Sequence, residues 1–289
     1  MAEVATAGVR RILAPNPSPF TGEGTNTWIV GGRRLAVIDP GPDDPGHLAA
    51  ILRAAGRGRI TAIVVTHAHA DHTALAPRLA DATGAPVHAF GDATAGRDPA
   101  IAALGDLGGG EGVDAAFAPD ILLPDGGVVA DEGWRLAALH TPGHMGNHIC
   151  LAMGDLMFSG DHAMGWATSI VSPPDGDMGA YMASLDRLIA RGPMRLLPGH
   201  GPAVEDGAAR LAALRAHRRG REAAIRAALA AGAATPAAIT AAVYADVPPA
   251  LHPAALRNVL AHLIDLVQRG QVDAPEGLSP TAPFIPRRA

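Results

Sequence analysis

Over the first two thirds of the chain, the hydrophobic positions fall in short, β-branched runs that end at polar, Gly or Pro residues. This pattern is typical of strands that feed loops. Residues 27–38 predict a hairpin and residues 60–65 a buried strand, with helices expected at 45–55 and 73–82, each closed by a Gly. The resulting β-α-β-α order indicates an α/β fold.

Further strands are expected later in the same region. They occupy residues 134–140, 149–153, 156–159 and 194–197, and each runs into a turn that contains Gly or Pro. The polar, Gly-rich stretch at 91–119 has no firm periodicity and receives no assignment.

The pattern changes after residue 205 to Ala- and Arg-rich helical sequence with few strand formers. We therefore expect a first domain at 1–205 and a small, mostly helical domain at 206–289. Thr235 and Pro236 fit the start of one helix, and Pro253 opens another that ends at Gly270. A short wing starting at Gln271 would complete a winged-helix-like arrangement.

Charge and composition exclude several classes of function. Acidic residues outnumber basic ones by 28 to 23, so no global positive field favours nucleic acid or a membrane surface. All 23 basic residues are arginine, which excludes a lysine Schiff base and a P-loop lysine.

The cysteine count and the apolar runs bear on location. The single cysteine, Cys150, cannot form an internal disulfide, and its apolar surroundings indicate a buried strand residue rather than a nucleophile. Residues 1–12 lack the apolar core of a signal peptide, and no run reaches the length of a membrane span. We expect a cytoplasmic protein that does not contact membranes.

Residues 66–72, THAHADH, place four metal-capable side chains at the end of a buried strand. Alternate residues of an extended segment face the same way, so His67 and His69 can hold one ion together. Where the chain turns into the next helix, Asp71 and His72 can face a second ion. One loop thus predicts ligands for two metals.

Neither ion is satisfied by two ligands, because zinc usually has four or five. His144, Asp161 and His200 each stand just past an apolar strand in a Gly- or Pro-bounded turn, where loops can converge. A carboxylate can bridge ions about 3.5 Å apart, and we assign that role to Asp161.

Other candidates have weaker patterns. Asp39, at the end of a strand, could orient a ligand imidazole from behind or only cap the turn. His148 and His162 could contact substrate, support the ligands from behind, or be hydrogen-bonded strand-end residues. The histidines at 47, 88, 217, 252 and 262 receive no role.

The motifs THAHADH, TPGHMGNH, FSGDH and PGHGP resemble those of the metallo-β-lactamase superfamily, in order and over roughly residues 20–205. The resemblance implies a four-layer αββα sandwich with the site along one edge of two packed sheets. Residues 16–21 and 24–27, together with the C-terminal part, are similar to the β-lactamase-like protein 2 group, whose members are described as single-strand endoribonucleases. Ala68, Ala70 and His162 depart from that pattern and leave the substrate open.

The predicted chemistry is hydrolysis. Two divalent ions, zinc being expected and manganese or iron alternatives, lower the pKa of a shared water toward about 7 and present it as hydroxide. Asp71 is the candidate catalytic residue that orients this water and accepts its proton. The expected substrate is a small ester, thioester, lactone or amide.

Three other functions compete with this one. RNA cleavage would use Arg215, Arg218, Arg219 and Arg221 to hold phosphates, although such a run is more often a solvated helix face. An iron persulfide dioxygenase shares the HAHADH loop, but the presence of His72 and His200 opposes it. A metal sensor that binds DNA or a partner through the C-terminal module is disfavoured by the net acidity, although such modules also form homodimer contacts.

Overall fold

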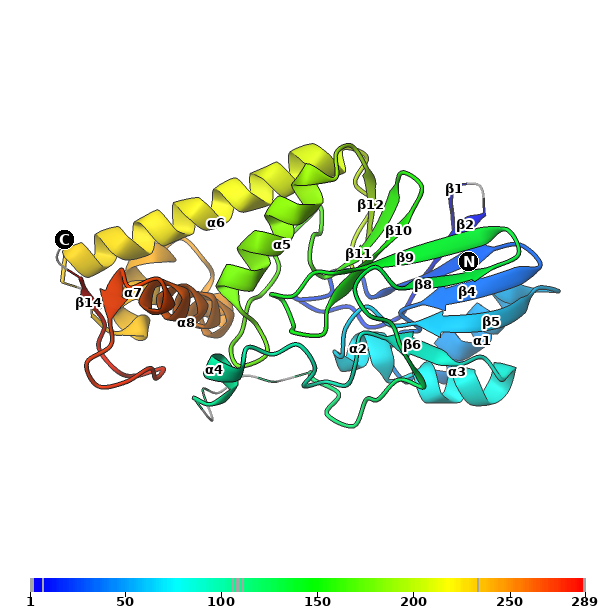
Figure 1. The fold of residues 1–289 in the computed structure, drawn as a ribbon, viewed down its shortest axis with the longest axis horizontal. Coiled ribbons are helices and arrows are strands. Elements are labelled where there is room, and N and C mark those ends of the chain that lie inside the picture. The colour runs from blue at the N-terminus through cyan, green and yellow to red at the C-terminus, as the bar shows by residue number, and fades with distance from the viewer. Residues whose placement is uncertain are drawn as a thin grey trace.

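Two β-sheets packed face to face form the centre of the larger part of the chain, as the computed structural model shows (Figure 1). The structure describes residues 3–6, 8–104, 107, 110, 112–232 and 234–287. Within them, no helix combines the length and the apolarity needed to cross a membrane.

The first sheet has seven strands in chain order. They are β1 (Glu3–Thr6), β2 (Val9–Leu13), β3 (Asn26–Gly31), β4 (Arg34–Ile38), β5 (Arg59–Val64), β6 (Val87–Ala89) and β7 (Ile121–Leu122). The first four pair antiparallel, and β4 to β7 pair parallel. The parallel strands end at the same edge of the sheet, where their loops can meet.

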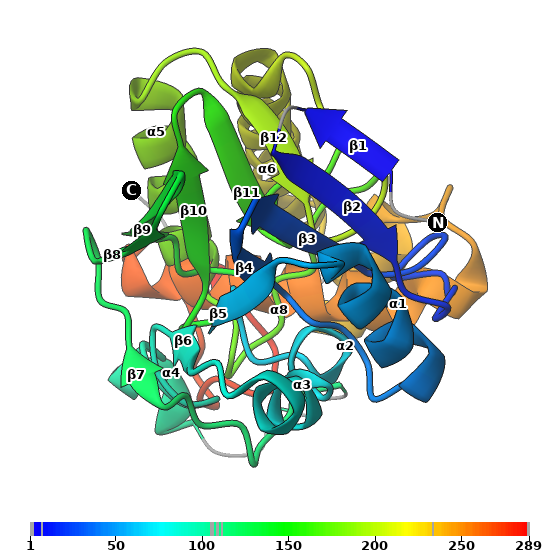
Figure 2. The ribbon, with the colours of Figure 1, turned by 90° about the vertical axis from the view of Figure 1, so that its right-hand side faces the viewer.

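The second sheet has five strands in the order β12-β11-β10-β9-β8. Their bounds are β8 (Val128–Asp131), β9 (Trp134–His140), β10 (Ile149–Met153), β11 (Leu156–Gly160) and β12 (Arg195–Pro198). Strands β11 and β12 run parallel, whereas the other neighbours are antiparallel. Figure 2 shows the strands of both sheets from another side.

Apolar side chains fill the space between the sheets. Trp28, Ile38 and Val64 of the first sheet pack with Leu151 and Phe158 of the second, and all are almost fully buried. Outside the first sheet lie α1 (Pro45–Ala55) and α3 (Ala76–Thr83); outside the second lie α5 (Met178–Ala190) and α6 (Gly207–Ala230). The implied four-layer αββα sandwich is confirmed.

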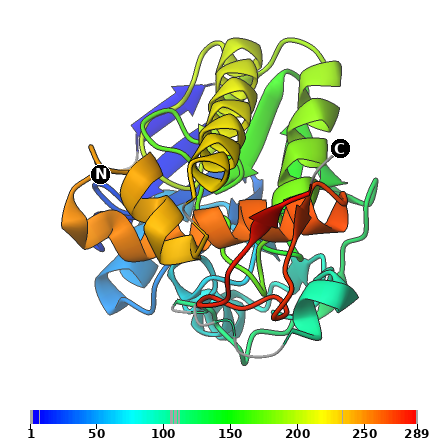
Figure 3. The same ribbon diagram turned by 90° about the vertical axis from the view of Figure 1, so that its left-hand side faces the viewer.

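The C-terminal part is built on the far half of α6 (Figure 3). Its further elements are α7 (Pro236–Val243), the 3-10 turn η1 (Pro249–Leu251), α8 (His252–Gln268), β13 (Val272–Asp273) and β14 (Ile285–Pro286). Thr235 caps α7 as predicted, and β13 pairs with β14 as the expected short wing. Since α6 packs on α5 with one half and on α7 and α8 with the other, the division at residue 205 stays a prediction.

Several elements differ from the sequence prediction. The helix expected at 73–82 is two helices, α2 (Ala70–Thr73) and α3, because the chain bends at Leu75 and Pro77 stands in the first turn of α3. In the unassigned stretch lies α4 (Pro99–Ala102), which is too short to show a helical period. The prediction also missed α5, although Asp177 caps it.

Candidate metal centre

The seven predicted donors meet at one edge of the sandwich, where β4, β5, β11 and β12 end. Their nitrogen and oxygen atoms fall into two groups, and the atoms of each group all lie within 4.8 Å of one another. The first group is His67, His69, His144 and Asp161, and the second is Asp71, His72 and His200. Segments that lie far apart in the sequence are therefore brought together as predicted.

In the first group, three imidazoles face one another. His69 Nδ1 lies 3.0 Å from both His67 Nε2 and His144 Nε2. Asp161 Oδ2 lies 4.0 Å from His67 Nε2 and 3.8 Å from His144 Nε2. Burial lowers the pKa of the three imidazoles, that of His69 to about 3. They are neutral at pH 7, and their facing lone pairs are available to a cation.

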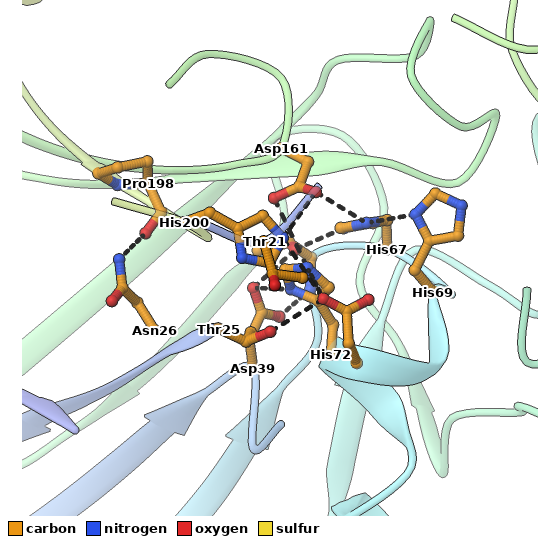
Figure 4. A network of polar contacts seen from close by, with 12 residues as sticks. Thr21, Thr25, Asn26, Asp39, His67, His69, His72, Asp161, Pro198 and His200 are labelled. Atoms are coloured by element: carbon orange, nitrogen blue, oxygen red, sulfur yellow. Dashed lines mark hydrogen bonds and ion pairs between the residues drawn. The ribbon is translucent and has the colours of Figure 1, made fainter. Parts of the chain in front are cut away.

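In the second group, carboxylates stand beside two imidazoles (Figure 4). Asp71 Oδ2 lies 3.5 Å from His72 Nε2 and 3.4 Å from His200 Nε2. Asp161 contacts this group with both oxygens: Oδ1 is 3.5 Å from His72 Nε2, and Oδ2 is 3.2 Å from His200 Nε2. Asp161 is thus the carboxylate that lies between the two groups, as expected of a bridging ligand.

The charges of the second group favour a cation. Burial alone would lower the pKa of His72, but Asp71, Asp161 and Asp39 outweigh it and raise that pKa well above the ordinary value. Burial would likewise raise the pKa of Asp161, but His200 and His72 hold it well below its usual range. The carboxylates are ionised, and binding of divalent ions would displace protons from the imidazoles.

Two buried atoms test whether the site fits a pair of metal ions. His72 Nε2 and Asp161 Oδ1 point into the cluster and lack a hydrogen-bond partner. Leaving such atoms unpaired is costly, and a cation between them would satisfy both. Imidazole nitrogens with carboxylate oxygens are a ligand set that suits zinc, and also manganese and iron. The residues fit two divalent ions.

Asp39 lies behind both groups. It is 1% exposed, and its Oδ2 is 3.0 Å from His72 Nδ1. It also accepts hydrogen bonds from the Thr66 backbone N–H and hydroxyl, each at 2.8 Å. The Thr66 hydroxyl in turn lies 3.0 Å from His67 Nδ1. One carboxylate thereby fixes the rings of two of these candidate donors with Nε2 toward the cluster, a common arrangement at metal sites.

Sequence reasoning missed the side chains that hold Asp71. The Thr25 hydroxyl donates to Asp71 Oδ2 at 2.9 Å, and Asn16 Nδ2 donates to the Thr25 hydroxyl at 2.9 Å. Asn16 Oδ1 also accepts from the Thr25 backbone N–H. His200 Nδ1 donates to the Gly24 carbonyl at 3.2 Å. Asn16, Gly24 and Thr25 all lie in the sequence motifs at 16–21 and 24–27, but nothing in those motifs indicated which distant residue each would contact.

His148 and His162 are fully buried beside the candidate donors. His148 Nδ1 is 2.9 Å from the Thr141 hydroxyl, and its ring centroid is 5.2 Å from that of His67. Both nitrogens of His162 lack a partner, and burial lowers its pKa to about 3. This burial favours a supporting position over contact with substrate, and the roles of both residues stay predictions.

The arginines considered for phosphate binding are mostly engaged within the protein. Arg218 is 2% exposed, so it is neither a phosphate contact on the surface nor part of a solvated face. Arg221 donates to the Val243 carbonyl and stacks on the Tyr244 ring, and Arg215 pairs with Asp186. The sequence prediction for Arg218 was wrong because its burial depends on tertiary packing.

An exposed aromatic side chain lies beside the loop that carries His200. This side chain, Trp166, is 44% exposed. The Trp166 indole lies against Gly22 and against Gly201, which follows His200; a Cβ at Gly201 would be 2.4 Å from the ring. The surface next to His200 therefore includes an exposed apolar ring on this side.

Comparison with known proteins agrees with this geometry. Residues 20–200 match the model of the metallo-beta-lactamase superfamily, and residues 235–277 match the beta-lactamase associated winged helix domain. The chain is 31% identical over 279 residues to a beta-lactamase-like protein 2 homolog of Drosophila melanogaster, covering 92% of this chain and 90% of that protein.

Two further proteins show the range of relatives. An atrochrysone carboxyl ACP thioesterase of Aspergillus chevalieri is 34% identical over 76% of this chain and 65% of its own length. The crystal structure of a metallo-beta-lactamase family protein from Thermus thermophilus shares the fold, with a TM-score of 0.78, 23% identity, and coverage of 98% of this chain and 100% of that one. The protein belongs to the metallo-beta-lactamase superfamily and carries the winged helix domain associated with it.

Proposed function

We propose that this protein is a dinuclear, metal-dependent hydrolase, with zinc as its metal, that acts on an ester, thioester, lactone or amide. One observation carries the proposal: five imidazoles and two carboxylates converge in two groups with Asp161 between them. Most of these donors are buried, and the fold alone would not require them to meet.

The donors form two sets, one for each ion. His67, His69, His144 and Asp161 would hold one ion, and Asp71, His72 and His200, again with Asp161, the other. Two ions bound in this way supply a hydroxide nucleophile at neutral pH and stabilise negative charge on a carbonyl oxygen. Asp39 and Thr66 keep the proton of His72 and His67 on Nδ1, so that each Nε2 is free to donate its lone pair.

Asp71 is our candidate for the proton acceptor. Its side chain is 27% exposed against 10% for Asp161, so it is the carboxylate that solvent and substrate can approach. Thr25 fixes Oδ2 by its hydrogen bond. Cys150 cannot compete as a nucleophile, because burial raises the pKa of its thiol to about 12.

Two observations support the proposed substrate class: an exposed aromatic ring beside the donor cluster and the name of one relative. The exposed Trp166 ring against Gly201 suits an acyl or ring-containing molecule, and the A. chevalieri relative is named a thioesterase. RNA cleavage has less support here, since Arg218 is buried, Arg221 donates to the Val243 carbonyl, and Arg215 is paired with Asp186 at the surface.

The test combines metal analysis with a substrate panel. We expect close to two metal ions per purified chain, and turnover of members of a thioester and lactone panel that stops when a chelator removes the ions. Labelled single-stranded RNA is the parallel substrate. A single tightly bound iron with oxygen consumption, or cleavage of RNA without any carbonyl substrate, would refute the proposed reaction.

A further inference from the structure

Segment 169–171 lies directly behind two of the metal donors. His144 Nδ1 donates to the Ile170 carbonyl at 2.6 Å, which turns His144 Nε2 toward the cluster. The Ser169 hydroxyl donates to the backbone carbonyl of Asp161, and the His162 carbonyl lies 2.9 Å from the same hydroxyl. The segment thus orients the ring of one ligand and holds the backbone of the shared carboxylate.

Two side chains from the C-terminal helices hold this segment. Arg218 of α6 donates to the Ser169 carbonyl and, at 3.0 Å, to Asn258 Oδ1. Asn258 of α8 accepts a second hydrogen bond at Oδ1, from the Val171 backbone N–H at 3.1 Å. Its Nδ2 donates to the Ala254 carbonyl, which fixes the orientation of the amide. A continuous set of hydrogen bonds therefore runs from α6 and α8 to His144 and Asp161.

Burial makes this set hard to replace by solvent. Arg218 is 2% exposed, Ser169 1% and Asn258 8%. In the part of the chain that the structure describes, Arg218 forms no ion pair; its guanidinium lies over the Tyr181 ring, 5.2 Å from the centroid. Burying a charge without a counterion is unfavourable unless its donors are satisfied by well-placed acceptors. Here the Ser169 carbonyl and the Asn258 amide oxygen accept from the two terminal nitrogens of Arg218, while its buried Nε has no hydrogen-bond partner.

We propose that Arg218 and Asn258 are positioning residues for the metal centre, so that the C-terminal helices complete a site whose ligands all lie outside them. The inference rests on the proposed function in one respect, that the donor cluster binds metal. His144 belongs only to the first donor group, so a loss of Arg218 weakens the ion of that group more than the ion held by Asp71, His72 and His200.

The experiment uses the full chain loaded with Co²⁺, whose absorption spectrum reports ligand number and geometry. Arg218→Met keeps the apolar stem but removes the donors, and Arg226→Met is the matched control, an exposed arginine two turns further along α6 that contacts Gln271. Competition with a chelator gives the affinity of each ion, and circular dichroism with thermal melting shows whether each variant is folded.

We expect Arg218→Met to bind one of the two ions about 10- to 100-fold more weakly, a loss of affinity typical of removing a group that orients a metal ligand. The Co²⁺ absorption spectrum should shift as well. Arg226→Met should match the unmodified protein. Unchanged affinities and an unchanged spectrum in folded Arg218→Met would overturn the inference. If that variant does not fold, Ser169→Ala takes its place, with the same shift expected and the same result against it. Failure of the unmodified protein to bind two ions would instead refute the proposed function.

Discussion

The two donor groups of the metal centre are supported by different parts of the chain. In the first, His144 is held by segment 169–171, which contacts α6 and α8. In the second, Asp71 and His200 are held by Thr25 and Gly24, in the loop before β3. Asp39 and Asp161 are the residues that connect the two groups, the first from behind and the second from between them.

The contrast is that the candidate donors and the side chains that hold them do not all lie within the part of the chain that matches the superfamily model. The match to the superfamily model, residues 20–200, contains all seven donors. It does not contain Arg218 or Asn258, and it also leaves out Asn16. A shortened chain limited to that range would keep every ligand and lose part of what orients the ligands of each group.

The largest loss of metal binding and activity is expected from a substitution at Asp161, which lies between the two donor groups. Asp161→Asn keeps the shape of the side chain but removes the charge that lies between them. Both ions should be lost on dialysis, with a fall in activity beyond the roughly 100-fold upper range of supporting residues. Metal analysis by mass spectrometry measures the loss, and two retained ions would contradict the bridging role.

Removing a donor that belongs to only one group should weaken the binding of one ion and leave the other bound. His69→Ala deletes a donor found only in the first group, and His200→Ala one found only in the second. Each variant should bind one of the two ions much more weakly and lose turnover, because the proposed chemistry needs the pair. Chelator titration of both proteins is the measurement. If the ion that remains bound had the same affinity in both variants, the two donor groups would not be separate binding sites.

Asp39→Asn is expected to affect both groups together, since its carboxylate contacts His72 directly and His67 through Thr66. An amide would place a donor either against both the His72 N–H and the Thr66 hydroxyl, which contact the same oxygen, or against the Thr66 backbone N–H at the other oxygen. Metal affinity should fall by about 10- to 100-fold at both ions. Thr66→Val serves as the companion variant, because it disconnects only His67; its effect should be confined to the first group in the same titration.

The smallest effect is expected at Thr25. Thr25→Val removes the hydrogen bond to Asp71 without changing the size of the side chain. Affinity for the second ion should drop by about 10-fold, with the first ion unaffected. Thr61→Val, which removes a hydroxyl bonded to the Leu35 carbonyl, is the control and should change neither ion. Equal effects of the two variants would mean that Thr25 acts on stability alone.

The convergence of the seven candidate donors could be predicted from the sequence better than the contacts of the side chains that hold them. His67, His69, Asp71 and His72 stand within six residues, and the three later donors follow strands, so chemistry and position pointed the same way. Thr25 and Ser169 carry only a hydroxyl, which is common in loops and has no spacing that marks a partner. Their roles depend on which distant atom lies opposite, and that is set by tertiary structure.

A similar limit applied to the fold. The hairpin at 27–38 and the strand expected at 60–65, which the structure has at Arg59–Val64, could be predicted because apolar runs and turn residues coincide there. The C-terminal wing was predicted on one side only, because Ile285, its pairing partner, is more than ten residues away and exposed. Arg218 gave no sign that it would be buried, since arginine on a helix is usually solvated.

The position of Trp166 also gives the site an optical reporter. The other two tryptophans, Trp28 and Trp134, are buried between the sheets, while Trp166 is exposed beside His200. A molecule that enters over Gly201 would change the surroundings of this indole alone, and Trp166→Phe would supply the background emission. Ligand entry could then be timed by stopped-flow fluorescence, without a label and before any product forms.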